Sequence, residues 1–219
     1  MNLRLDMPRS ARFRILSKEL NRLKKQFLPS ISPTGFYSNR QLARTLAYRV
    51  LAHAEIESYL EDRVWEVVTE AKRNWDSSGK AHRTLICLIA FSGQAMDAPP
   101  NTLTPTKPNK TLPPGKFKIN KKIELAINCF KRVIDQNHGL KEANILALLL
   151  PIGIDSDDLD PALLATMNTF GEQRGLVAHS SATAYRTVQP PDPATELNTV
   201  KQIIQGLLQV DKLISSLIR

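Results

Sequence analysis

The sequence predicts an all-α fold, a helical bundle with short hairpins and one or two long loops, and three observations carry this prediction. Apolar residues recur at the three- and four-residue spacing of a helix in each long segment. No segment shows the alternation of apolar and polar residues that is typical of a half-buried strand. Pro and Gly separate the periodic segments, and a chain of 219 residues is long enough to bury a sizeable core.

The predicted helices begin and end at residues with cap or breaker chemistry. Ser38 or Asn39 predicts the N-cap of a long second helix. Asp160 followed by Pro161 predicts the start of another, because Asp caps a helix and Pro fits its first turn. Between the segments, Pro and Gly residues break the pattern. The predicted helical segments are 11–28, 39–75, 80–94, 120–137, 141–154 (cut by Pro151 and Gly153), 161–180 and 194–219.

The chain is predicted to divide into a basic N-terminal helical extension, residues 1–38, and a helical domain, residues 39–219. Residues 96–118 are crowded with Pro, Thr, Lys and Asn, which predicts a long exposed loop within this domain.

The net charge of +9 is concentrated in two basic zones. Residues 1–49 contain 11 Lys and Arg residues against two acidic ones, and residues 106–132 contain 8 against one. Such zones favour a polyanion such as RNA through phosphate contacts and counterion release. Solvated helix faces explain them equally well, and a membrane-surface or partner-binding role for the first helix is a further alternative.

Several functional classes have no support in the sequence. No apolar run is long enough to span a bilayer, and the N-terminus lacks the apolar region of a signal peptide, so a soluble cytoplasmic protein is expected. Cys87 and Cys129 lie in apolar runs, which indicates reduced thiols. No Gly-rich phosphate loop or zinc-spaced Cys pair is present, and the acidic residues at 155–160 are interpreted as caps and a solvated turn, so no cofactor and no metal are expected.

Ionisable residues interrupt the apolar faces of two predicted helices. Arg174 falls within the apolar stripe of 161–180, while Arg49, His53 and Glu57, four residues apart, lie on the stripe of 39–75. An unpaired charge on a packed face is costly, so Arg174 requires a carboxylate or a phosphate. Either Glu57 pairs with it in a structural bridge, or these faces meet at a cleft where an anionic ligand completes the charge balance.

Arg174 and His179 form an Arg-x4-His pair near the end of their helix. Arg132 and His138 form a rival pair with a spacing one residue longer. The spacing alone does not choose between the two pairs.

Four stretches of this chain together resemble the HEPN superfamily, in particular its RiboL-PSP-HEPN branch, over about residues 40–215. The resemblance assigns the Arg-x4-6-His motif of the family to Arg174 and His179, whereas the polar residue, often Asn, that usually follows the arginine is Gly175 here. The stretches are AYRVLAHAEIESYLED (47–62), LLLPIGI (148–154), LDPALL (159–164) and RGLVAHS (174–180).

The resemblance implies a helical bundle that dimerises through the motif helices and acts, as many members do, as a metal-independent endoribonuclease. Several such proteins serve as toxins or in defence against phage, which is the role expected here. The 2′-hydroxyl of RNA would be the nucleophile, giving 2′,3′-cyclic phosphate and 5′-hydroxyl ends. His179 would transfer protons and Arg174 would neutralise phosphate charge. Glu57 would orient Arg174, with His53 and Arg49 in support. The expected partners are RNA, a second copy of the chain, and an antitoxin or defence-system protein; a catalytically inactive module for dimerisation, docking or nucleic-acid binding is the alternative.

Overall fold

The computed structural model describes residues 9–95, 118–179 and 191–218, and this part of the chain is helical without a strand. The all-α prediction is therefore confirmed, and the predicted helices are present with shifts of a few residues at their ends. The loop predicted at 96–118 lies almost entirely outside the described residues. The helices are α1 (Ala11–Phe27), α2 (Asn39–Ser78), α3 (Arg83–Phe91), α4 (Ile119–Asp135), α5 (Glu142–Leu149), α6 (Pro161–His179) and α8 (Pro193–Leu217), with a 3₁₀ turn at Ser156–Asp158.

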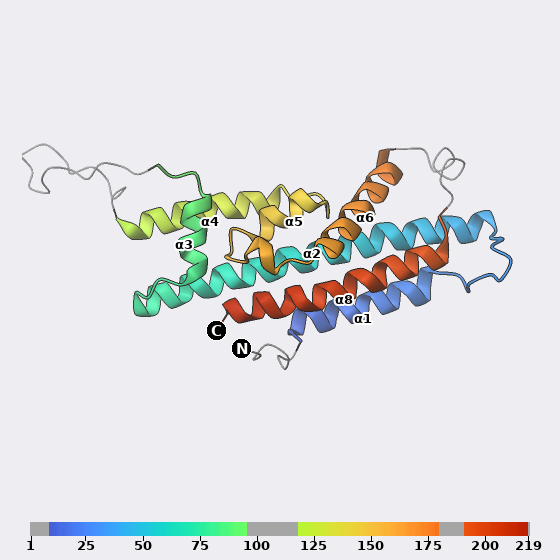
Figure 1. Cartoon of the computed structure of the whole chain (residues 1–219), viewed down its shortest axis with the longest axis horizontal. Coiled ribbons are helices and arrows are strands. Elements are labelled where there is room, and N and C mark those ends of the chain that lie inside the picture. The colour runs from blue at the N-terminus through green and yellow to red at the C-terminus, as the bar shows by residue number, and fades with distance from the viewer. Residues whose placement is uncertain (1–8, 96–117, 180–190, 219) are drawn as a thin grey trace, which may run out of the picture.

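The long helix α2 is the axis on which the other helices pack (Figure 1). It contains 40 residues and begins at a capping box, in which Ser38 accepts a hydrogen bond from the backbone of Gln41 and the Gln41 side chain accepts one from the backbone of Ser38. It ends at Gly79, whose φ of 67° is the left-handed conformation that favours glycine. Helices α1 and α8 lie along one side of α2 and α3 to α5 lie on the other, while α6 packs against both α2 and α8.

The basic helix α1 packs its apolar face into the same core as the rest of the bundle. Its buried side chains are Phe13, Leu16, Leu20 and Leu23. Phe13 contacts Tyr59 of α2 edge-on, with ring centroids 5.8 Å apart. The boundary expected at residue 38 thus separates two helices that share one hydrophobic core.

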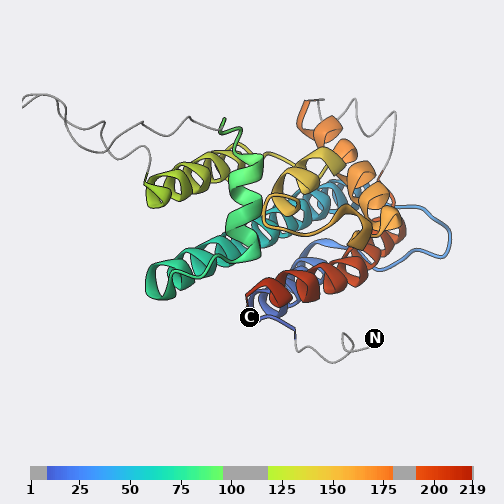
Figure 2. The same ribbon diagram turned by 60° about the vertical axis from the view of Figure 1, so that its left-hand side comes forward.

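Helix α6 leans away from α2, and its C-terminal end projects from the bundle in both views (Figures 1 and 2). Its first half is anchored by apolar contacts, because Leu163, Met167 and Phe170 are buried. Gly206 of α8 allows Leu163 to approach closely, since a Cβ atom at Gly206 would lie 2.6 Å from a methyl carbon of Leu163. The packing of α6 against α8 therefore depends on a residue without a side chain.

Buried ion pairs join α8 to α2 inside this apolar core. Asp211 of α8 lies 3.1 Å from Nε of Arg63 and accepts a hydrogen bond of 2.9 Å from the hydroxyl of Tyr59. The same carboxylate accepts hydrogen bonds from the backbone N–H and the hydroxyl of Ser10, the N-cap of α1. Burial, and then the charge of Asp211, raise the pKa of the Tyr59 phenol. One carboxylate thus connects three helices.

A second buried pair lies further along the same interface. Arg49 of α2 donates from Nε to Glu196 of α8 over 2.9 Å, and both side chains are almost fully buried. Two buried ion pairs, Arg63–Asp211 and Arg49–Glu196, therefore hold α8 against α2.

The helices described include none with the length and apolar character that a membrane-crossing segment requires.

We expect Asp211→Ala to lower the free energy of unfolding by about 3–5 kcal/mol, because it leaves the buried Arg63 guanidinium without its buried counter-charge. Urea unfolding followed by circular dichroism measures this change. Asp76→Ala is the matched control, since Asp76 pairs with Lys72 on the exposed surface and its loss should cost no more than about 1 kcal/mol. Equal effects of the two substitutions would contradict the structural role of Asp211.

Candidate functional site

Arg174 lies on α6 one turn beyond the buried Phe170, where the helix leaves the core. Asp160 caps the start of α6 by accepting a hydrogen bond of 2.9 Å from the backbone of Ala162, as the sequence predicts. The Arg174 side chain is half-buried, and within the described part of the chain it has no hydrogen-bond or ion-pair partner. No carboxylate of this described part therefore neutralises its guanidinium.

Arg174 lines a pocket of about 550 Å³. The pocket is enclosed by α2, by the connection between α4 and α5 together with the first turns of α5, and by the second half of α6. Its lining residues are His53, His138, Gly139, Lys141, Asn144, Gly171, Glu172, Arg174, Gly175 and Leu176.

His53 is the buried polar group of this pocket. Its side chain is 1% exposed and lies beside the ring of Phe170, with ring centroids 5.8 Å apart. Its Nδ1 lies 3.5 Å from Oε2 of Glu57, yet neither ring nitrogen has a hydrogen-bond partner in the described chain. Leaving buried polar groups unsatisfied costs about 1–3 kcal/mol each, so His53 has hydrogen-bonding capacity open to a bound molecule.

Glycine at position 171 brings the two walls of the pocket together. A Cβ atom there would lie 3.1 Å from the backbone nitrogen of Lys141 and 3.3 Å from the carbonyl carbon of Leu140. The side-chain oxygen of Asn168 also accepts a hydrogen bond from the backbone of Glu142 over 3.3 Å. Both contacts fix the start of α5 against α6, one turn before Arg174.

The structure separates some of the residues that the sequence groups together. Glu57 lies next to His53, and no ion pair joins it to Arg174. Arg49 is engaged with Glu196 and is not among the residues that line the pocket. The backbone of His179 forms the last residue of α6, but its side chain lies outside the described part of the chain.

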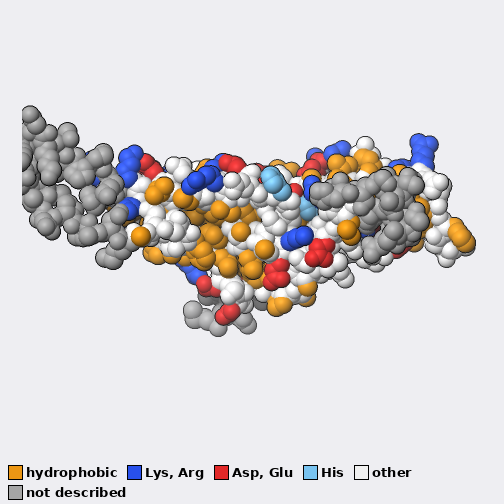
Figure 3. Space-filling model, turned by 90° about the horizontal axis from the view of Figure 1, so that it is seen from above, with side chains coloured by type: hydrophobic (Ala, Val, Ile, Leu, Met, Phe, Trp, Pro, Cys, Tyr) orange, Lys and Arg blue, Asp and Glu red, His pale blue; other side chains and the backbone are white. Residues whose placement is uncertain are grey.

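His138 and Lys141 line the pocket although sequence reasoning gave them no site role. His138 belongs to the rival Arg-x5-His pair, whose arginine, Arg132, is exposed and donates a hydrogen bond to Cys129. The sequence around His138 does not predict that this residue lines a pocket. The pocket forms only because α5 approaches α6 at Gly171, which is a long-range contact. Figure 3 shows the molecule from above. Histidine and charged side chains lie near the middle of this face, beside a broad apolar area.

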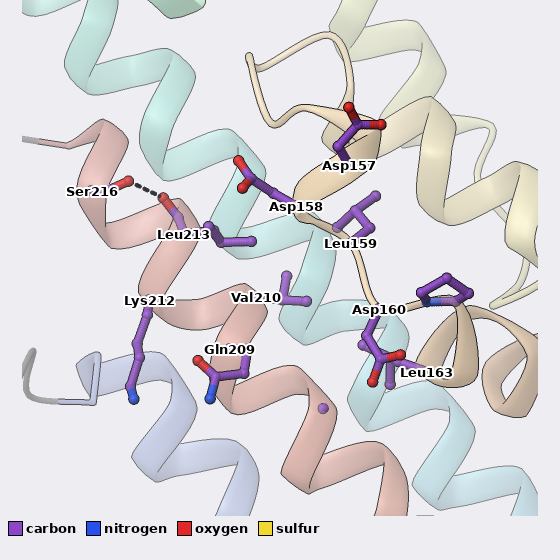
Figure 4. A pocket seen from close by; sticks show the side chains of 12 residues that line it. Asp157, Asp158, Leu159, Asp160, Leu163, Gln209, Val210, Lys212, Leu213 and Ser216 are labelled. Carbon is purple, nitrogen blue, oxygen red and sulfur yellow. Dashed lines mark hydrogen bonds between the residues drawn. The ribbon is translucent and has the colours of Figure 1, made fainter. Parts of the chain in front are cut away.

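A second pocket, of about 480 Å³, lies between the start of α6 and α8 (Figure 4). Its rim carries Asp157, Asp158 and Asp160, and its floor is apolar. The three carboxylates point in different directions in Figure 4. Among the residues that the structure describes, no group of three or more His, Cys, Asp or Glu side chains is arranged to hold a metal ion.

Comparison with known proteins gives one match. The sequence pattern of the family described as RiboL-PSP-HEPN matches residues 11–217. No curated protein and no solved structure matches the chain.

Two glycines one turn apart on α6 allow a matched test of the pocket geometry. We expect Gly171→Ala to destabilise the protein by about 1–3 kcal/mol, because the new methyl group meets the backbone of α5. Gly175→Ala should be neutral or stabilising by up to about 1 kcal/mol, because its Cβ atom meets nothing within 4 Å and Ala favours helix. Thermal and urea unfolding measure both changes. If Gly175→Ala were destabilised while Gly171→Ala were neutral, this description of the packing would be wrong.

Proposed function

Because the chain belongs to the RiboL-PSP-HEPN family, we propose that it is an endoribonuclease that cleaves RNA without a metal ion and uses Arg174 and His179. HEPN domains are often ribonucleases. The observation that carries the proposal is the half-buried Arg174, which has no partner within the described chain and lines an open pocket with Lys141 and two histidines.

RNA supplies the nucleophile for this reaction, since its 2′-hydroxyl attacks the adjacent phosphorus and the 5′ oxygen leaves. The products are a 2′,3′-cyclic phosphate and a 5′-hydroxyl. His179 moves the protons, because an imidazole with an unperturbed pKa of about 6.5 accepts and donates a proton near neutral pH. Arg174 neutralises the charge that develops on the phosphate oxygens.

His53 and Glu57 support the site from α2 in this proposal. The separation of Glu57 from Arg174 changes its proposed role, because its carboxylate lies beside His53. Glu57 therefore orients the imidazole of His53, which offers a hydrogen bond to the bound nucleotide. Arg49 acts at a distance, by holding α8 on α2.

The proposed active form is a symmetric homodimer. The reaction needs one group to remove the 2′ proton and another to protonate the leaving oxygen, and two copies of His179 facing each other across one cleft would supply both. The described end of α6 projects from the bundle, and this placement supports a contact with a second copy (Figure 1). We further propose that the enzyme is a cytoplasmic toxin or anti-phage effector, restrained by an antitoxin or a defence-system protein.

A second candidate function is a catalytically silent module that uses the same helices for dimerisation, partner docking or nucleic-acid binding. The observation that favours it is Gly175, which stands where the family often has a polar residue after the arginine. A glycine supplies no side chain for the substrate, and a Cβ atom there would meet open space.

Cleavage of RNA in EDTA distinguishes the two candidates. We expect the wild type to cleave single-stranded RNA, and His179→Ala and Arg174→Ala each to reduce the rate by about 10²–10⁴-fold with the helical content unchanged. Arg132→Ala is the matched control, because it removes the arginine of the rival pair. Absence of cleavage by the wild type, or a requirement for added Mg²⁺, would favour the silent module or a different mechanism.

A dimer-dependent site predicts inhibition by an inactive subunit. Excess His179→Ala protein should lower wild-type activity after subunit exchange, because mixed dimers contain one histidine at the cleft. Sedimentation equilibrium gives the fraction of dimer under the same conditions. Full activity at concentrations where the protein is monomeric would rule out the shared site.

A further inference from the structure

We infer that the connection between α4 and α5 forms a second phosphate subsite, where Lys141 and His138 bind the phosphate next to the one held by Arg174. This inference rests on the proposed function, because it assigns the rest of the pocket to the same RNA strand. It adds Lys141, which lies outside both Arg–His pairs, and gives a role to His138, the histidine of the rival pair.

The charges in the pocket favour an extended anion. Arg174 lines it from α6 and Lys141 from the start of α5, and within the described residues neither side chain has an ion-pair partner. The one acidic lining residue, Glu172, accepts a hydrogen bond of 3.0 Å from the Asn168 amide. Lys141 is exposed and therefore solvated, so it does not require a counter-charge, but a strand with successive phosphates would meet both cations whereas a single phosphate at Arg174 would meet one.

A buried, unpartnered group in the pocket indicates a ligand with polar atoms. Both nitrogens of His53 are unsatisfied although the side chain is 1% exposed, and the ring lines the same pocket as Arg174 and Lys141. A nucleotide that connects two phosphates carries hydroxyl and base groups that can hydrogen-bond there. A pocket built for one small inorganic anion would not require this third polar group.

The backbone segments that carry the two cations are held against each other. Gly171 brings the backbone of Lys141 against α6 one turn before Arg174. The hydrogen bond from the Glu142 backbone to Asn168 holds the same junction. Backbone packing thus limits the range over which the two cations can lie apart, and this preorganisation lowers the entropic cost of binding two phosphates together.

Acidic residues limit the subsite on the far side of His138. There a neighbouring pocket of about 350 Å³ shares His138 and is lined by Glu61, Asp62 and Asp135 against one cation, Lys131. Lys131 pairs with Asp135 over 2.7 Å, and Asp62 pairs with Arg12 over 2.7 Å. Burial raises the pKa of Glu61, while the hydrogen bond from Asn137 lowers it. These carboxylates disfavour a further phosphate, so the strand is expected to leave the protein at His138 instead of continuing toward α4.

The test measures binding of an oligonucleotide that cannot be cleaved. A single-stranded RNA with 2′-O-methyl groups throughout lacks the nucleophile, and fluorescence anisotropy over a series of KCl concentrations gives its affinity and salt dependence. We expect Lys141→Gln to weaken binding by roughly two- to fivefold and to reduce the log–log salt slope by about 0.7, the value for one lost contact to a single strand. In the double variant Lys141→Gln/Arg174→Gln, the salt slope should fall by about 1.4, the value for two lost contacts to a single strand.

Two variants control for general charge effects. Lys141→Arg should keep the slope, because the cation is retained. Lys80→Gln removes an exposed lysine about 40 Å along α2 from His53 and should change nothing. The subsite proposal would be wrong if Lys141→Gln left the salt slope unchanged. It would also be wrong if Lys80→Gln reduced the slope as much as Lys141→Gln does.

The outcome for the subsite is separable from that for the nuclease. If the wild type cleaves RNA but Lys141→Gln binds normally, the proposed function stands and the subsite fails. If the wild type does not cleave but the slope depends on Lys141, the nuclease proposal fails and the subsite stands.

Discussion

The carboxylate of Asp211 is the interaction on which the arrangement of the bundle depends. It binds Arg63 and Tyr59 of α2 and the cap of α1, all from a position on α8 that is almost fully buried. A buried charge of this kind is costly unless it is fully partnered, so the three helices have one relative placement in which the cost is offset. The pair of Arg49 and Glu196 repeats the constraint nearer the start of α8. Together they define the surface of α2 and α8 on which α6 packs.

The candidate site follows from how α6 packs on that surface. Leu163 seats the start of the helix on Gly206, and Gly171 brings its middle against α5. Beyond Phe170 the helix has left the core, which explains why Arg174 is half-buried and without a partner in the described chain while Met167 and Phe170 are fully buried. A guanidinium at the margin of a core keeps its charge and gains a less polar surround, conditions that strengthen its attraction for a phosphate.

The pocket combines functions that come from three distant parts of the chain. Helix α2 contributes His53, the α4–α5 connection contributes Lys141 and His138, and α6 contributes Arg174. Across His138 the balance of charge changes sign, from two cations and one carboxylate in the pocket of Arg174 to three carboxylates and one cation in the pocket beside it. For a polyanionic ligand this change of sign defines a direction of approach, which a uniformly basic surface would not do.

The helical class, most helix ends and the place of Arg174 on a partly buried helix face could be predicted from the sequence alone, because apolar periodicity, caps and a charge within an apolar stripe are local properties. The sequence also placed His53 and Glu57 on the buried side of α2. Only the tertiary structure decided which charges meet: Arg49 binds Glu196, Arg63 binds Asp211, Glu57 lies beside His53, and Lys141 joins Arg174 at one pocket. Helical periodicity predicts which face of a helix is buried, but it does not predict which helix packs against that face. The packing partner depends on long-range contacts such as the approach of α5 to Gly171.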